Sequence, residues 1–415
     1  MTRRTAAVAV MSAGALWGVL FAVGFTHYTS NASVMAAGLG GLGLLGVWSA
    51  RRRFVADDSP LGRWVRLVTI VGHDCVAFAV INMTSRQARD LIAAYWEIHL
   101  NDTLVTLVVA LVAVLCWWVS NAVLWRVIEG FLYVALAVAA WTTYVVVRGG
   151  GYDGNHLSTL VGSGASSAMI LRGVAVAMVS FVIVDLVIAR WRNVPTASLV
   201  LVRPAIIFLT LIAMGLSYVV VTGAGTFTSN IPFTFAGVAA TYGGHGVQVA
   251  CELLYVGLLL VSSIVLLRDV RDSPIFGAMF TGGARSRRGR VLLAAAVMAL
   301  SVLPLGIAEM FQLGIAVTLI AWFALALRAM VHVSRDAEPW YEWFPPVVAA
   351  SITSLGLYGA VDRHLSWDGQ SSSRHVAQTV VVVVAISAVA YALEVRRGSR
   401  QGPWAVAFND QREVE

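Results

Sequence analysis

The sequence predicts an all-α, polytopic integral membrane helical bundle, and three observations predict it. Hydrophobic residues make up 59% of the 415 residues, charged residues only 12%, and the mean hydropathy is +0.79. Soluble domains contain about 45–50% apolar and about 25% charged residues. Long apolar segments recur along the chain, and arginines concentrate in alternate connections between these segments. We therefore expect a membrane domain with little chain left over.

A transmembrane helix needs about 20 mostly apolar residues. Twelve segments approach or meet this requirement. The three over 291–361 are short or closely spaced. We therefore expect about 10–12 transmembrane helices. The segments are 6–25, 32–50, 64–83, 103–120, 127–147, 168–189, 204–221, 246–267, 291–307, 313–327, 347–361 and 376–395.

The arginines orient these segments. The chain has 29 arginines and lysines, and every one is arginine. With the N-terminus inside, 23 of the 29 fall on the inner side and 6 on the outer side. Cytoplasmic connections of membrane proteins carry such an excess. The sequence therefore predicts a multi-pass protein of the cell membrane with both termini in the cytoplasm.

The domain organisation follows from the short connections, which leave no room for an inserted soluble domain. We expect one transmembrane domain over 1–395 and a short, disordered cytoplasmic tail over 396–415. Two similar arginine-rich loops favour a 6+6 pseudo-repeat with halves 1–195 and 196–395. The loops share Asp-Ser-Pro, at 58–60 and at 272–274. Duplicated halves with a binding site at their interface are common among transporters.

The absence of lysine excludes several chemistries. A P-loop nucleotide site, a pyridoxal or retinal Schiff base and a kinase site each need a lysine amine. The net charge of +7 and the pI near 9.7 do not indicate nucleic acid, because the basic residues lie beside apolar segments. Cys75, Cys116 and Cys251 are expected to be small core residues rather than metal ligands. We therefore predict no cofactor, no metal site and no nucleic-acid partner.

The same composition, with abundant alanine, valine, glycine and arginine, favours a GC-rich, actinobacterial-type genome. Two predicted outer segments are unusual. Segment 84–102 places apolar residues on one helical face and is predicted to lie on the membrane surface. Segment 222–245 is long and apolar for a loop and favours a re-entrant structure.

The best functional candidates are ionisable residues inside apolar segments, because a charge at the bilayer centre costs about 2.5–3.5 kcal/mol or more. His73 and Asp74 are predicted near the middle of segment 64–83, with Arg66 one heptad before His73. The pair suits proton relay or ion binding. The alternative is an internally paired cluster that fixes helix packing.

Three further residues complete the set of candidate ion- or substrate-coupling residues. Glu252 is predicted about 9 Å from the outer end of segment 246–267. Asp185 lies near the inner end of segment 168–189, and Arg172 lies toward its outer end. Arg172 is expected to extend toward the membrane surface.

The leading functional hypothesis is translocation of a small solute or ion, with proton coupling through His73, Asp74 and Glu252. A second hypothesis is a membrane enzyme that acts on a lipid or lipid-linked substrate at the outer face. This enzyme would use outer acids and histidines such as Glu97, His99, Asp102 and His245. A third is a non-catalytic subunit or sensor that binds a cytoplasmic protein through its arginine-rich loops. The absence of a soluble domain and of nucleotide or catalytic motifs favours a protein that is not an enzyme, with the lipid bilayer as its main partner.

Overall fold

The computed structural model describes residues 33–54, 60–150, 240–272, 287–302, 307–336, 339–361 and 377–389, with a few residues between 170 and 178. All regular secondary structure in these ranges is helical, which confirms the all-α prediction for them. The helices are α3 (Ser33–Phe54), α4 (Pro60–Trp96), α5 (Asp102–Leu115), α6 (Asn121–Gly150), α12 (His245–Asp272), α14 (Arg287–Ser301), α15 (Ile307–Arg335), the 3-10 helix η3 (Trp340–Trp343), α16 (Phe344–Val361) and Ala377–Val389.

Four of the described helices are long and apolar enough to cross a membrane. The spans are Leu67–Trp96, Ala122–Gly149, His245–Arg268 and Met310–Arg335, within α4, α6, α12 and α15. Each exceeds the about 20 residues that a bilayer requires. The described part of the chain is therefore consistent with an integral membrane protein. Segments 6–25 and 204–221 and most of 168–189 lie outside the described residues, as do both termini.

Predicted segment boundaries differ from the structure at several places. The segment 103–120 corresponds to α5, which ends at Leu115 after 14 residues. The break predicted at 308–312 is wrong, because α15 begins at Ile307 and is helical through those positions. Alanine, glutamate, methionine and glutamine are good helix formers, so the local sequence there favours helix rather than a turn.

The largest difference concerns α4, which has 37 residues and ends at Trp96 rather than near 83. The surface helix predicted over 84–102 is therefore wrong for residues 84–96, which continue α4. Thr84 and Ser85 are buried, and their hydroxyls donate to the carbonyls of Val80 (2.7 Å) and Ile81 (2.8 Å). A hydroxyl that bonds the preceding turn lets a polar residue stay inside a helix.

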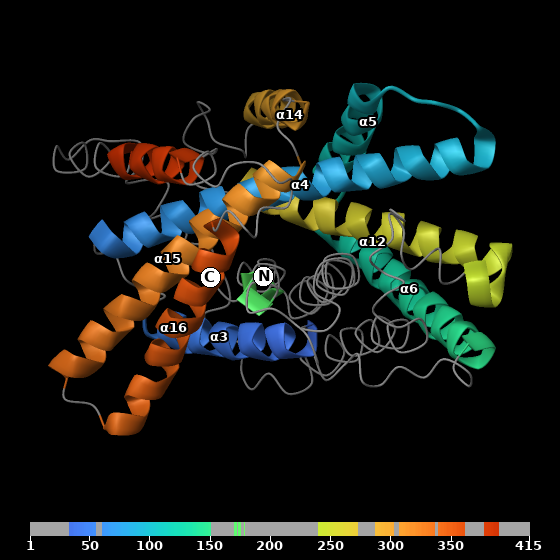
Figure 1. The fold of residues 1–415 in the computed structure, drawn as a ribbon. Helices are drawn as coiled ribbons and strands as arrows, with labels where there is room; N and C mark the ends of the chain where they lie inside the picture. Colours follow the sequence, from blue (N-terminus) through green and yellow to red (C-terminus); the bar gives the residue numbers. More distant parts are fainter. Residues whose placement is uncertain are drawn as a thin grey trace.

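The helices around α4 form the centre of the molecule. Figure 1 shows α4 and α12 side by side, while α15 crosses α4 obliquely and α16 runs beside α15. Helix α3 packs against α16 and α15, and α5 and α6 contact α12. The core between them contains large buried side chains such as Trp117, Trp322 and Ile81.

Glycines allow α4 and α15 to approach closely. A Cβ atom added to Gly314 would lie 3.0 Å from the carbonyl oxygen of Gly72, and one added to Gly72 would clash with the hydroxyl of Thr318. Small residues bring helix backbones together in membranes, where van der Waals packing drives association. The crossing therefore depends on these two glycines.

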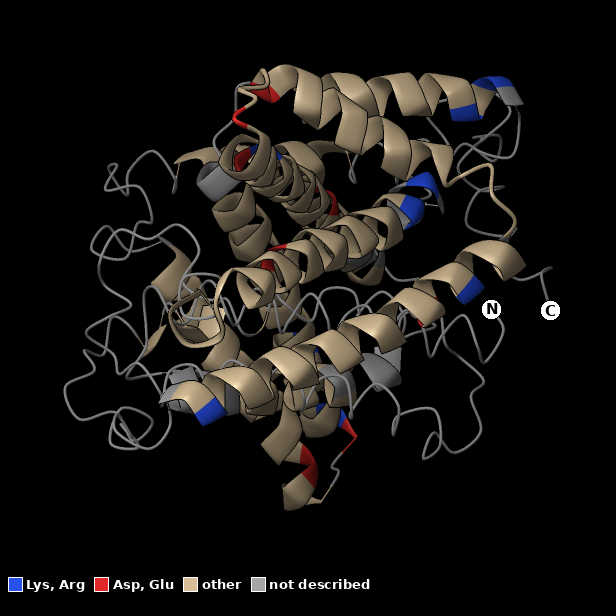
Figure 2. Ribbon diagram, turned by 90° about the vertical axis from the view of Figure 1, so that its right-hand side faces the viewer, with Lys and Arg blue, Asp and Glu red and all other residues tan. Residues whose placement is uncertain are grey.

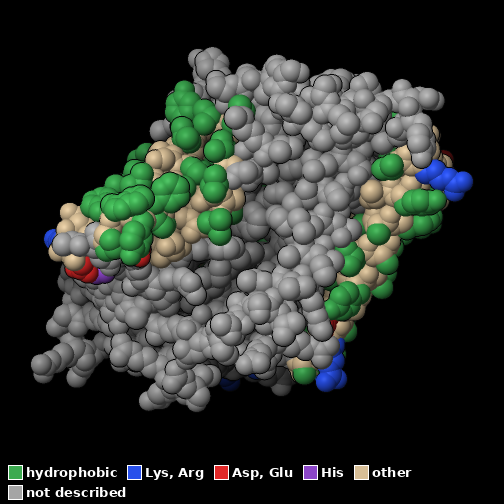
Figure 3. Space-filling view, turned by 90° about the horizontal axis from the view of Figure 1, so that it is seen from below, with side chains coloured by type: hydrophobic (Ala, Val, Ile, Leu, Met, Phe, Trp, Pro, Cys, Tyr) green, Lys and Arg blue, Asp and Glu red, His purple; other side chains and the backbone are tan. Residues whose placement is uncertain are grey.

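The outer faces of the described helices are strongly apolar. Helix α6 is the most exposed of the four spans, since 28% of its apolar 18-residue window is buried against 72% of the corresponding windows in α4 and α15. Its exposed side chains include Val127, Val134, Trp141 and Tyr144. Figure 2 places arginines mainly at helix ends, and Figure 3 shows hydrophobic side chains over the described helices of one face. Such a surface suits contact with lipid.

Candidate functional site

The structure describes three of the six candidate residues fully. His73 and Asp74 lie in α4 and Glu252 in α12, and all three are buried, with 2%, 7% and 7% of their surface exposed. Arg66 belongs to α4, but its side chain lies outside the described residues. Arg172 and Asp185 also lie outside them.

His73 and Asp74 directly follow Gly72, at the crossing of α4 and α15. Thr318 of α15 is fully buried there, with its hydroxyl directed at Gly72. The pair lies six or seven residues from the start of the span Leu67–Trp96 rather than at its middle. The pair therefore lies nearer one end of this longer helix than segment 64–83 indicated, because α4 continues beyond residue 83, and its depth in the membrane stays a prediction.

Glu252 lies in the interface between α12 and α4, beside a part of α4 far along the chain from the α15 crossing at Gly72. Its Oε1 accepts a 3.2 Å hydrogen bond from Nε2 of Gln248, one turn earlier in α12. The Tyr95 hydroxyl of α4 lies beside the carboxylate. That hydroxyl is a second hydrogen-bond donor to the carboxylate, beside the Gln248 amide. Two donors thus surround one buried carboxylate.

The N-terminal end of α12 also contacts Tyr95. The His245 ring lies against the Tyr95 ring, with centroids 5.4 Å apart. Gly244, just before α12, has φ +77°, a left-handed conformation that glycine adopts without strain. This turn ends the preceding helical residues and lets α12 begin at His245.

A second polar contact between α4 and α12 lies three helical turns away. The hydroxyls of Thr84 and Ser263 are hydrogen-bonded at 3.1 Å, and both residues are buried. Thr84 precedes Tyr95 by 11 residues, and Ser263 follows Glu252 by 11 residues, which is about three turns in each helix. The two helices are therefore antiparallel and keep one register over about 16 Å.

The three candidate residues that the structure describes do not form one site. Glu252 lies beside Tyr95, and Tyr95 is 22 residues beyond His73 in the same helix, or about 33 Å along it. The structure therefore brings His73 and Asp74 together at the α15 crossing and places Glu252 near the other end of α4. Among the described residues, no group of three or more histidine, cysteine, aspartate or glutamate side chains is arranged to hold a metal ion.

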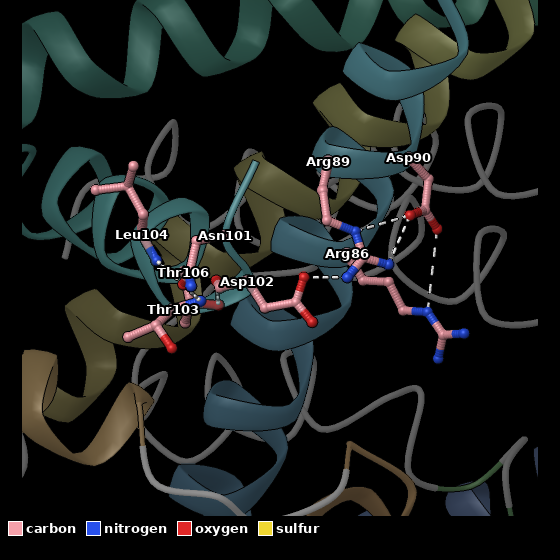
Figure 4. A network of polar contacts seen from close by, with 8 residues as sticks. All are labelled: Arg86, Arg89, Asp90, Asn101, Asp102, Thr103, Leu104 and Thr106. Atoms are coloured by element: carbon pink, nitrogen blue, oxygen red, sulfur yellow. Dashed lines mark hydrogen bonds and ion pairs between the residues drawn. The ribbon is translucent and has the colours of Figure 1, made fainter. Parts of the chain in front are cut away.

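The outer acids of the enzyme hypothesis have structural contacts. Arg89 bonds both Asp90 (Nη2–Oδ1, 2.7 Å) and Asp102, which joins the end of α4 to the start of α5 (Figure 4). Asn101 caps α5, its side chain accepting from the backbone amide of Thr103 at 2.9 Å. Glu97, immediately after α4, has φ 56° and ends that helix.

Two arginines of α12 also have a role that the sequence pattern did not predict. Arg268 donates to the carbonyl of Cys116 (3.2 Å) and Arg271 to that of Trp117 (3.3 Å), just after α5 ends. The Arg268 guanidinium also lies 6.0 Å from the centre of the Trp125 ring. Cations stabilise the carbonyl end of a helix. These arginines therefore fasten α12 to α5 besides contributing to the charge bias.

Tyr95 and Gln248 are the site residues that sequence reasoning missed. Their positions carried a usable pattern, because Thr84 and Tyr95 share one face of α4 while Glu252 and Ser263 share one face of α12. No protein-family model matches this chain, and no curated protein sequence is significantly similar to it.

Proposed function

We propose that this chain translocates a small solute or ion across the cell membrane, and that Glu252 and the His73–Asp74 pair take up the coupling proton or cation. The observation that carries the proposal is the burial of Glu252. Within the described residues its carboxylate has one amide donor, a neighbouring tyrosine hydroxyl and no salt bridge. The apolar helices supply the membrane setting.

The physical argument is the cost of a buried charge. An ionised carboxylate in a membrane helix costs about 2.5–3.5 kcal/mol or more on insertion scales. A proton or a bound cation removes most of that cost, so the energy of the site depends on cation uptake. Asp74 is also buried, beside His73. These two buried acidic side chains lie far apart along α4, which suits a pathway in which a proton or cation binds at more than one site.

The decisive experiment is proton flux into liposomes that contain the purified protein. An imposed membrane potential should drive proton uptake, read from a trapped pH-sensitive dye. We expect E252Q and D74N to lower the flux about tenfold or more, because each removes a group that charges and discharges during transport. E342Q, on the 3-10 helix η3, is the matched control and should retain flux.

Flux that is unchanged in both E252Q and D74N would contradict the proposal. Wild-type liposomes with no more flux than empty ones, over a range of added solutes, would contradict it as well. The variants must first elute as single species from size exclusion, since a misfolded variant also loses flux.

The contacts of the outer acids weigh against an enzyme at the outer face. Asp102 is bonded to Arg89 and His245 lies against Tyr95, so two of the four residues have structural partners. A catalytic pair would need hydrogen-bond reach to a shared substrate. Under this proposal the bilayer is the main partner, and a cytoplasmic protein at the arginine-rich loops remains compatible with transport.

A further inference from the structure

The turn between α15 and α16 exposes large aromatic side chains. Trp340, Tyr341 and Phe344 have 83%, 57% and 68% of their surface exposed. The Trp340 and Tyr341 rings lie edge to face, with centroids 6.2 Å apart. Apolar surface gathered in one place is unfavourable in water and marks an interaction surface. We call residues 340–344 the aromatic turn.

The aromatic turn directly follows a membrane span. The span Met310–Arg335 within α15 ends five residues before Trp340. Its 26 residues extend about 39 Å, which exceeds the about 30 Å of a hydrocarbon core. The turn joins the ends of α15 and α16 that lie away from the crossing with α4 (Figure 1). A bilayer that α15 crosses therefore has a headgroup layer at the level of the aromatic turn.

Prolines fix the shape of the aromatic turn. Pro339 precedes η3 with φ −62° and ψ 153°. Pro345 and Pro346 lie in the first turn of α16, where a backbone nitrogen has no partner within the helix. Restricted backbone angles lower the entropy that a segment loses when it binds. The turn is therefore built to hold its rings in one arrangement.

The charges of the turn restrict its partner. Residues 335–344 contain one arginine and three acidic residues, Asp336, Glu338 and Glu342. An anionic surface would repel this excess of negative charge. Tryptophan and tyrosine each combine an apolar ring with one polar N–H or O–H group, and they favour the boundary between headgroups and acyl chains. The composition therefore fits a lipid headgroup layer that need not carry net charge.

We propose that the aromatic turn inserts into the headgroup layer of the bilayer and anchors the α15–α16 pair there through its rings rather than through charge. The orientation predicted from the arginines makes this the cytoplasmic layer. The anchor would set the level of α15 in the membrane, and with it the level of the crossing at Gly72 that carries His73 and Asp74. It does not depend on the proposed transport function.

The test is the membrane depth of a nitroxide spin label at position 341. Tyr341→Cys is made in full-length protein in which Cys75, Cys116 and Cys251 are replaced by alanine. The labelled protein is reconstituted at low density in phosphatidylcholine liposomes. Oxygen concentrates in lipid and a water-soluble nickel chelate stays outside it, so the ratio of their collision rates with the label reports its depth.

Two further labelled positions calibrate the ratio. Val134→Cys is the lipid reference, because Val134 is 61% exposed near the middle of the span Ala122–Gly149. Asp336→Cys is the aqueous reference, at the polar side of the same turn. We expect the oxygen-to-nickel ratio at position 341 to exceed that at position 336 several-fold. Added NaCl should leave the ratio unchanged, because salt screens exposed charges and not apolar contacts.

Removal of the neighbouring rings tests what holds the turn in lipid. W340S and F344S, combined with Tyr341→Cys, should lower the ratio toward that of Asp336→Cys. Both side chains are exposed, so size exclusion and circular dichroism should show an unchanged fold.

Three results would overturn the proposal. A ratio at position 341 equal to that at position 336 would place the turn in water. Low collision rates with both reagents would indicate a protein contact, such as a second copy of the chain. A ratio that falls with added salt, or that stays high in W340S with F344S, would show that the rings are not the anchor.

Discussion

The buried hydroxyl groups of Thr84 and Ser263 form a polar contact between α4 and α12. Thr84 and Ser263 are fully enclosed, and each hydroxyl also lies near a carbonyl of its own helix, Val80 and Leu259 respectively. Each hydroxyl has only one proton, so the 3.1 Å contact between them must share protons with those carbonyls. The net strength of the contact is therefore modest, but it fixes the register that brings Glu252 to Tyr95.

The strength of this contact can be measured by a double-mutant cycle. Thr84→Val and Ser263→Ala should couple by about 0.6 kcal/mol, with an upper limit of about 1.7 kcal/mol, as found for hydrogen bonds between membrane helices. The measurement is reversible unfolding of the purified protein in mixed micelles. Ser301→Ala is the control partner, because Ser301 bonds the carbonyl of Val297 in its own helix, and its effect should add to that of Thr84→Val. Additive effects in both cycles would contradict a direct contact.

At the scale of elements, close helix packing depends on glycine at particular positions. The α4–α15 crossing has backbone against backbone at Gly72 and Gly314, and the Phe131 ring of α6 packs on Gly257 of α12. The crossing also carries His73 and Asp74, so its geometry sets the surroundings of that pair. By contrast, an added Cβ at Gly130 of α6 would meet nothing within 4 Å.

Alanine substitutions at these glycines should therefore differ in sign. Gly72→Ala forces a methyl group into Thr318 and should lower the free energy of unfolding by about 1–3 kcal/mol. Gly130→Ala should be neutral or stabilise by up to about 1 kcal/mol, because alanine favours helix more than glycine does. Thermal unfolding in detergent reports both. Equal effects of the two substitutions would show that α4 and α15 do not cross at Gly72.

At the scale of the whole molecule, two groups of helices both pack against α4. Helix α4 packs against α15, which pairs with α16 and α3, and also against α12, which contacts α5 and α6. Helix α4 therefore connects the His73–Asp74 position with the Glu252 position. Motion of one group of helices relative to the other would change the surroundings of both positions, as alternating access requires.

The predicted orientation places the turn after α4 outside and the turn after α15 inside. In a background with Cys75, Cys116 and Cys251 replaced by alanine, His99→Cys should react with a membrane-impermeant maleimide in intact cells. Asp336→Cys should react only after permeabilisation. Both positions are exposed, so reactivity reports the side of the membrane rather than burial. The reversed pattern would invert the topology that the arginine distribution predicts.

The sequence predicted the helices more reliably than their ends. Nine of the twelve predicted segments coincide with described helices, because length and apolar composition are local properties. The end of α4 was misplaced because Thr84, Ser85 and Arg86 resemble the start of a loop. In the structure the two hydroxyls bond their own helix, and Arg86 lies 4.0 Å from Asp90 one turn later. Local polar groups that satisfy one another do not interrupt a helix.

Composition alone gives the chemical class of the chain: it is helical, has a membrane-like composition and lacks the lysine that several enzyme mechanisms need. The sequence also singled out His73, Asp74 and Glu252, because charge in an apolar segment is visible in one dimension. The position of Glu252 beside Tyr95 and far from His73 and Asp74 follows from the packing of α12 on α4 and is not visible in the sequence. Helix register comes from side-chain packing between segments distant in the chain, and no local pattern specifies which helices become neighbours.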